Sequence, residues 1–150
     1  MSIFISIASY QDPLLVSTIF SAYENAQNKD QLVFSICDQS DEGIQLEEIE
    51  FKDQIHYEHV DPLFSKGPCW ARHRAQNYFN NENYFLQIDS HTQFAKDWDE
   101  IFIEQLNKIS SIKSDDGYHE KPIITSYPRG FEVMDFDKGI FGLHMEDKFT

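Results

Sequence analysis

Short apolar runs alternate with amphipathic segments through most of the chain. Four runs are brief, rich in branched and aromatic residues and bounded by polar positions, as buried strands are: residues 3–8, 32–37, 55–60 and 84–88. Between the first two runs, apolar residues recur every three or four positions from Leu15 to Ala26, which predicts an amphipathic helix. Asp12 and Pro13 precede this helix and are typical of a helix N-terminus, with Asp as the cap and Pro in the first turn.

The second half of the chain predicts two more helices and one more strand. A helix over residues 69–79 follows Pro68, which is well placed to open it. Another helix is expected from Asp97, which together with Glu100 has the spacing of a capping box. After a polar loop, residues 122–126 have the composition of a fifth strand.

Strands that alternate with helices are typical of β-α-β units joined by right-handed crossovers. We therefore predict an α/β fold with a mostly parallel sheet and flanking helices. The length of 150 residues is that of one domain.

Polar or aromatic residues follow four of the five predicted strands. These are Ser9-Tyr10, Asp38-Gln39, Asp89-Ser90-His91 and Ser126-Tyr127. Because the carboxyl ends of parallel strands meet at one edge of a sheet, and ligands bind at that edge in open α/β folds, the four groups predict a common site.

The Asp89-Ser90-His91 triplet is the strongest chemical signal among them. A carboxylate and an imidazole two residues apart can turn toward one point where a strand gives way to a loop, and together they suit a divalent cation. A simple turn is the alternative interpretation of the triplet. Taken singly, Asp38 is more typical of a turn and Tyr10 of a packed aromatic side chain.

Two arginines, Arg72 and Arg74, lie on the helix predicted after Pro68. Guanidinium groups bind phosphate oxygens bidentately, and a helix N-terminus also favours anions. Residues two apart on a helix point about 200° away from each other, so at most one of the two is expected to face the site. Lys66, in the preceding loop, is a further candidate, and an ordinary charged surface is the alternative interpretation.

The composition excludes several classes of protein. The net charge of −14, much of it in the acidic segment 41–61, argues against nonspecific binding to nucleic acid. The two cysteines, Cys37 and Cys69, cannot form a disulfide framework or a zinc-finger spacing, and Cys37 is expected to be a buried free thiol. No apolar stretch approaches the roughly 18 residues of a membrane span, and the N-terminus lacks a basic leader, so we expect a cytoplasmic protein.

Four segments, in this order and spacing, resemble the cytoplasmic, Skp1-type family of polypeptide N-acetylglucosaminyltransferases. They are Phe4-Ile-Ser-Ile-Ala-Ser-Tyr-Gln-Asp-Pro13, Gly67-Pro-Cys-Trp-Ala-Arg72, Tyr84-Phe-Leu-Gln-Ile-Asp-Ser-His91 and Ser126-Tyr-Pro128. The resemblance covers about residues 3–130. The chain is more distantly similar to the mucin-type polypeptide GalNAc-transferases, which also use Asp-x-His where related enzymes use Asp-x-Asp.

The resemblance implies a GT-A fold, in which a Rossmann-like sheet binds a nucleotide-sugar at its carboxyl edge. It implies that Asp89 and His91 bind Mn²⁺ or Mg²⁺, which bridges the diphosphate of UDP-GlcNAc. The metal would neutralise the departing UDP as a Lewis acid. The sugar would pass, with retention of configuration, to a hydroxyl of a protein or peptide acceptor.

The resemblance also implies roles for four residues on the donor side. Ser9 and Tyr10 would contact the nucleotide, and Asp38 would hold the uridine. Arg72 would lie near the donor phosphates or sugar and add a fixed cation during catalysis, whereas Trp70 is expected to pack the helix rather than bind sugar.

The length of the chain is the main departure from this family, whose members are usually much longer. We therefore expect residues 1–150 to form the N-terminal, nucleotide-sugar-binding portion of an incomplete GT-A domain, with the acceptor portion missing. A nucleotide-sugar-binding module without catalysis is the first alternative. A flavodoxin-like signalling domain, with Asp38 and Asp89 in an acidic Mg²⁺ pocket, is the second.

Overall fold

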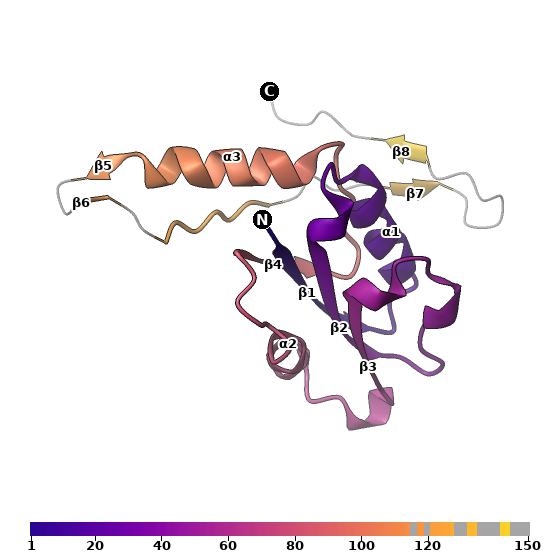
Figure 1. Ribbon diagram of the computed structural model, residues 1–150. Helices are drawn as coiled ribbons and strands as arrows, with labels where there is room; N and C mark the ends of the chain where they lie inside the picture. Colours follow the sequence, from indigo (N-terminus) through magenta and orange to yellow (C-terminus); the bar gives the residue numbers. More distant parts are fainter. Residues whose placement is uncertain (115–116, 119–120, 128–131, 135–141, 145–150) are drawn as a thin grey trace.

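The main sheet of the protein is parallel throughout. The computed structural model shown in Figure 1 describes residues 1–114, 117–118, 121–127, 132–134 and 142–144. Four strands pair in the order β3-β2-β1-β4: β1 (Ile3–Tyr10), β2 (Leu32–Gln39), β3 (Ile55–Val60) and β4 (Tyr84–Asp89). The predicted α/β class and parallel sheet are therefore confirmed, and the order is that of a partial Rossmann-like fold.

Two helices cover opposite faces of this sheet (Figure 1). Helix α1 (Leu15–Asn25) connects β1 to β2, and α2 (Pro68–Gln76) lies between β3 and β4. The chain moves outward from β1 to β3 and then returns across β1 to β4, so right-handed crossovers place the two helices on opposite sides. Each face of the sheet therefore has its own apolar layer, a large one under α1 and a small one under α2.

The remaining elements lie outside the main sheet. Helix α3 (Trp98–Ser110) begins against the C-terminal end of α1. Two short antiparallel ladders follow it: β5 (Lys113–Ser114) with β6 (Gly117–Tyr118), and β7 (Glu132–Met134) with β8 (Gly142–His144). None of the helices in the described residues has the length and apolar character needed to cross a membrane.

The predicted fifth strand is wrong. Residues 122–126 are described without helix or strand, and Ile123 is 88% exposed. A strand needs a partner for its backbone groups, and this segment has no ladder in the described part of the chain. The pair Ser126-Tyr127 therefore does not end a strand of the main sheet.

Both predicted helix caps differ from the structure. Asp97 has a left-handed backbone (φ 59°), and its side chain makes no capping hydrogen bond. Its N–H, which Glu100 would accept in a capping box, donates instead to Asn25 O at 2.7 Å. The predicted capping box with Glu100 is therefore wrong. Asp12 caps the turn before α1, where its Oδ1 accepts the Leu14 N–H at 2.9 Å, and the helix begins later, at Leu15.

The two cysteines occupy different environments. Cys37 lies at 0% exposure in the layer under α2, which confirms the expected buried free thiol. Burial, with the neighbouring Glu58 carboxylate, raises the pKa of the Cys37 thiol to about 11. Cys69, at the start of α2, is exposed. The layer under α2 is thus small and contains a protonated, unreactive thiol.

Asp99 fixes the start of α3 to the chain segment that follows α1. Its carboxylate is 1% exposed and accepts the backbone N–H groups of Gln27 and Asn28, both at 2.9 Å. Burial raises the pKa of Asp99, but these hydrogen bonds outweigh burial and leave the pKa below its ordinary value. The stability contributed by the ionised group is therefore present at neutral pH and is lost as the pH falls through the lowered pKa.

Asp99→Asn is expected to lower the free energy of unfolding by about 1–3 kcal/mol at pH 7, because two N–H groups lose a charged acceptor. The difference from wild type should shrink as the pH falls from about 4, where Asp99 of the unfolded chain takes up a proton, through the lowered pKa of Asp99 in the folded protein. Urea titrations followed by circular dichroism between pH 3 and pH 7 measure both effects. Glu100→Gln is the control, because Glu100 is an exposed acid in the same helical turn. If the difference in unfolding free energy between wild type and Asp99→Asn stayed constant with pH, the role given to the ionised Asp99 would be wrong.

Candidate functional site

The carboxyl edge of the main sheet contains the candidate site. The chain adds β2 and β3 on one side of β1 and β4 on the other, so the order reverses between β1 and β4. In doubly wound sheets, ligands bind outside the carboxyl ends of the strands at such a switch point. Asp89 ends β4, and Asp12 lies in the loop that leaves β1. These two loops therefore define the centre of the candidate site.

The Asp89-Ser90-His91 triplet is held by partners from two different elements. Asp89 is exposed, and its Oδ1 accepts Arg72 Nη2 at 3.2 Å. Ser90 is buried, whereas the side chain of His91 is 59% exposed. Ser90 Oγ donates to Asp12 Oδ2 at 2.6 Å, and His91 Nδ1 lies 2.8 Å from the same oxygen. The triplet is therefore a fixed structure with two exposed ends and a buried middle.

Asp12 is the carboxylate on which this loop depends. Burial raises the pKa of Asp12, but the hydrogen bonds from Ser90, His91 and Leu14 outweigh burial and leave the pKa below its ordinary value. The group is therefore ionised at neutral pH and acts as an acceptor.

Helix α1 fixes the segment that follows the triplet. Thr18 Oγ1, fully buried, donates to Ser90 O at 2.7 Å and accepts the Thr92 N–H at 3.0 Å. One turn later, Ser21 Oγ accepts the Phe94 N–H at 2.9 Å. The hydroxyl groups of α1 thus satisfy backbone groups that no sheet ladder serves.

Only one of the two arginines on α2 points to the triplet. Arg72 reaches Asp89, while Arg74 forms an ion pair with Glu58 and its guanidinium lies 5.0 Å from the centre of the Trp70 ring. The two arginines thus point to different partners, as their spacing on the helix predicted. Trp70 is half-buried and packs in the layer under α2, as expected for a helix-packing residue.

The ends of β1 and β2 place the other three predicted residues side by side. Ser9 pairs with Asp38 in the parallel register, and Tyr10 follows with 59% exposure. Ser9 Oγ is buried and has no hydrogen-bond partner among the described residues. Asp38 is buried, and Tyr57 donates its hydroxyl to Asp38 Oδ2 at 2.8 Å. Tyr10 is thus open to a ligand, whereas the Ser9 hydroxyl is enclosed in the protein and one oxygen of Asp38 is already used.

Gln39 ties this edge to the loop before α2. Its Nε2 donates to Ser9 O at 2.8 Å, and its Oε1 accepts Ser65 Oγ at 2.6 Å. The side chain is buried, so both of its polar ends are used inside the protein. The strand that carries Ser9 and the loop that leads to Arg72 are therefore connected through one amide.

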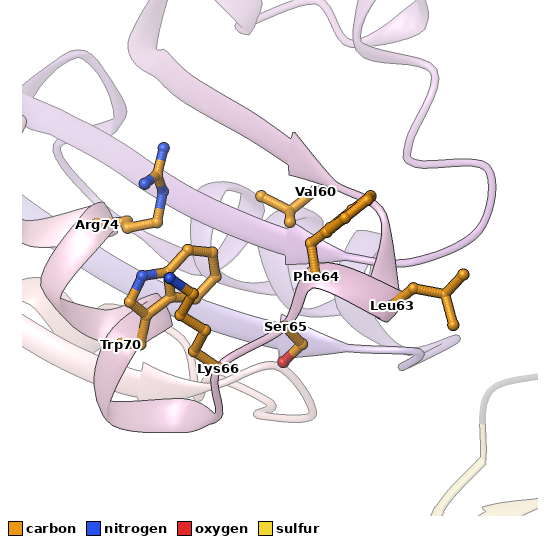
Figure 2. Close-up of a pocket in the computed structure, with 7 residues that line it drawn as sticks. All are labelled: Val60, Leu63, Phe64, Ser65, Lys66, Trp70 and Arg74. Atoms are coloured by element: carbon orange, nitrogen blue, oxygen red, sulfur yellow. The ribbon is translucent and has the colours of Figure 1, made fainter.

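A separate hollow of about 500 Å³ lies beyond the end of β3 (Figure 2). Phe64 and Trp70 form its apolar walls, and Ser65 and Arg74 contribute polar atoms. Neither Asp89 nor His91 lines this hollow. Lys66, the loop lysine considered as a further candidate, also lines this hollow. We place the candidate chemistry at the triplet because the triplet lies at the switch point of the sheet.

A protein-family model described as glycosyltransferase (GlcNAc) matches residues 41–141. The chain belongs to this glycosyltransferase family. No curated protein and no solved structure matched the chain. The matched segment includes Arg72, Asp89 and His91 and begins after Ser9, Tyr10 and Asp38. The reaction class of the protein is therefore glycosyl transfer, with a nucleotide-sugar donor and an acceptor as partners.

The metal ligands that the sequence suggested have suitable chemistry in this glycosyltransferase. Asp89 is exposed, and its Oδ2 makes no hydrogen bond to the described residues. Nε2 of His91 likewise makes no hydrogen bond to the described residues. One oxygen and one nitrogen donor suit Mn²⁺ and related cations. No cluster of three or more His, Cys, Asp or Glu residues able to hold a metal occurs in the described part of the chain. Asp89 Oδ2 and His91 Nε2 thus have the donor chemistry of ligands to a divalent cation.

Sequence reasoning missed three residues that build the candidate site. Asp12 was predicted only as a helix cap, although an acid between a strand end and a helix is also placed to reach a neighbouring loop. Thr18 interrupts the apolar face of its helix, which is a signal for a buried hydroxyl with a specific partner. Gln39 was noted at a strand end, but its connection to Ser65 depends on tertiary structure.

Proposed function

We propose that this glycosyltransferase transfers GlcNAc from UDP-GlcNAc, with retention, to a hydroxyl of a protein or peptide and requires Mn²⁺ or Mg²⁺. The observation that carries the proposal is the position of Asp89, His91 and Arg72 at the switch point of the sheet. There a carboxylate and an imidazole are exposed beside a guanidinium that already bonds to the carboxylate. This combination of charges suits a diphosphate with its cation.

Asp89 and His91 would hold the cation in this proposal. The bound cation supplies Lewis acidity, which stabilises the negative charge that develops on UDP as the sugar–phosphate bond breaks. Asp89 and His91 themselves bind and orient the cation, and they need not exchange a proton with the donor.

Arg72 would stabilise the same charge from the protein side. Its Nη2 bonds to Asp89, and its Nε is buried without a partner among the described residues. The side chain is 35% exposed, so its accessible guanidinium nitrogens, and not the buried Nε, would donate to a phosphate oxygen while its charge stays fixed. Arg72 therefore serves as the catalytic cation of the proposal.

The ends of β1 and β2 would receive the nucleoside. Tyr10 presents an exposed ring for stacking, whereas the hydroxyl of Ser9, the residue before it, is buried. Burial and then the bond to Asp38 raise the pKa of Tyr57, so its hydroxyl remains a donor to Asp38. Asp38 is thereby held in place at the position where the uridine would lie.

Thermal unfolding with a panel of donors tests the proposal. UDP-GlcNAc, UDP-GalNAc, UDP-glucose and GDP-mannose are each compared with Mn²⁺ and with EDTA. At 100 times its Kd, UDP-GlcNAc with Mn²⁺ should stabilise the protein by about 2.7 kcal/mol. The other donors should give smaller shifts at equal concentration. The absence of a metal-dependent shift with every UDP-sugar would refute metal-dependent donor binding.

Turnover separates the enzyme from a module that binds nucleotide-sugar without catalysis. Both bind UDP-GlcNAc with Mn²⁺, but the enzyme also releases UDP faster when a hydroxyl-containing peptide is added. Product mass and the anomeric configuration of the new linkage then identify the sugar and the retention. Donor binding without acceptor-dependent UDP release would support the module.

A further inference from the structure

The contacts of Asp12 divide between its two carboxylate oxygens. Oδ1 accepts the Leu14 N–H at 2.9 Å and so serves the turn that leads into α1. Oδ2 faces the triplet, where it accepts Ser90 Oγ at 2.6 Å and contacts His91 Nδ1 at 2.8 Å. Oδ1 therefore serves the start of the helix, and Oδ2 contacts only the triplet loop among the hydrogen bonds of the described residues.

This geometry determines which nitrogen of His91 carries a proton. An ionised carboxylate can only accept, so Nδ1 must be the N–H that donates to Asp12. In the neutral ring, the lone pair then lies on Nε2, which has no hydrogen-bond partner in the part of the chain that the structure describes. The side chain of Asp12 is 14% exposed, whereas that of His91 is 59% exposed. A partly buried anion thus holds an exposed ring by one nitrogen and leaves the other nitrogen available.

We propose that Asp12 is a positioning residue that holds His91 in the Nδ1–H form and so presents Nε2 to the divalent cation. Carboxylates that accept from the outer nitrogen of a metal-binding histidine fix its tautomer and increase its basicity. The assignment rests on the proposed metal site. Asp12 lies in the loop that follows β1, 79 positions before His91 in the chain, so this loop would support the proposed metal site.

Asp12→Asn tests this role with little change in shape. The amide keeps an oxygen for the Leu14 N–H, but its NH₂ group cannot accept from Nδ1 of His91 or from Ser90 Oγ. Long-range ¹H–¹⁵N NMR on the metal-free protein should show His91 as the Nδ1–H tautomer in wild type. In Asp12→Asn the Nε2–H tautomer should gain population, a change that a role in helix capping alone would not produce.

Mn²⁺ affinity, measured by electron paramagnetic resonance, gives the second readout. Asp12→Asn should bind Mn²⁺ roughly 10- to 100-fold more weakly than wild type, which is the usual effect of mutating a residue that hydrogen-bonds to a metal-binding histidine. Asp41→Asn is the matched control, since Asp41 is an exposed acid at the same edge that accepts from Gln11. The control should leave both the tautomer and the affinity unchanged.

The outcomes separate the two proposals. Mn²⁺ binding by wild type with the same tautomer and affinity in Asp12→Asn would overturn the role of Asp12 and leave the metal site intact. Failure of wild type to bind Mn²⁺, with or without UDP, would overturn the metal site and the role of Asp12 together. If Asp12→Asn does not fold, the wild-type spectrum decides, because a predominant Nε2–H tautomer contradicts the assignment without any variant.

Discussion

In Asp89→Ala, the Mn²⁺-dependent part of the stabilisation by UDP-GlcNAc is expected to disappear while the fold stays intact. Asp89 is exposed at the end of β4, so its loss should change the free energy of unfolding of the unliganded protein by less than about 1 kcal/mol. For wild type at 100 times Kd, stabilisation of about 2.7 kcal/mol corresponds to roughly 5–10 °C in a chain of this length. The variant should show the same melting temperature with Mn²⁺ as with EDTA.

Asp53→Ala is the matched control for this experiment. It removes the same charge from an exposed position just before β3, at the opposite edge of the sheet from the triplet. The control should keep the full shift of wild type. A normal Mn²⁺-dependent shift in Asp89→Ala would mean that the triplet is a turn and that the cation, if any, binds elsewhere.

Trp98→Ala is expected to have the largest effect on stability. Trp98 is 3% exposed, packs between Phe94 and Phe102, and donates its Nε1–H to Ala22 O at 2.8 Å. Removal of a buried indole leaves a cavity and an unsatisfied carbonyl, which typically costs about 3–5 kcal/mol. Chemical denaturation followed by far-UV circular dichroism measures the loss.

Ile101→Ala, on the same helix with 47% exposure, should cost less than about 1 kcal/mol. A similar cost for both substitutions would contradict the packing of α3 on α1. The pair of variants thus separates the anchored face of α3 from its exposed face.

The sequence alone predicted the main sheet well, because each strand carries its own local signal. The bounds of β3 were predicted to the residue, and α1 buries the face that its spacing indicated. The other strands run slightly further than their apolar runs, since Ser9 and Asp38 continue the parallel register. Backbone hydrogen bonds do not require apolar side chains, so a ladder can extend into the polar residues of a site.

The errors arose where a local pattern depends on a distant partner. The segment 122–126 is apolar enough for a strand, but composition cannot show whether a neighbouring strand is available. Asp97 and Glu100 have the right spacing for a capping box, but the hydrogen bond from Asp97 N–H to Asn25 sets a different backbone. The choice between Arg72 and Arg74 likewise required the positions of Asp89 and Glu58.

The parallel pairing of β1 with β4 has a consequence for how the protein acquires its site. Ile3 pairs with Tyr84, so the first strand gains this partner only after the intervening chain has been placed. Contacts of such long sequence separation form slowly, because the loop must close before they contribute stability. If the proposed metal site is correct, refolding monitored through Mn²⁺ binding should therefore lag behind the recovery of helical signal, and a nascent chain could not form this site until it has emerged past His91.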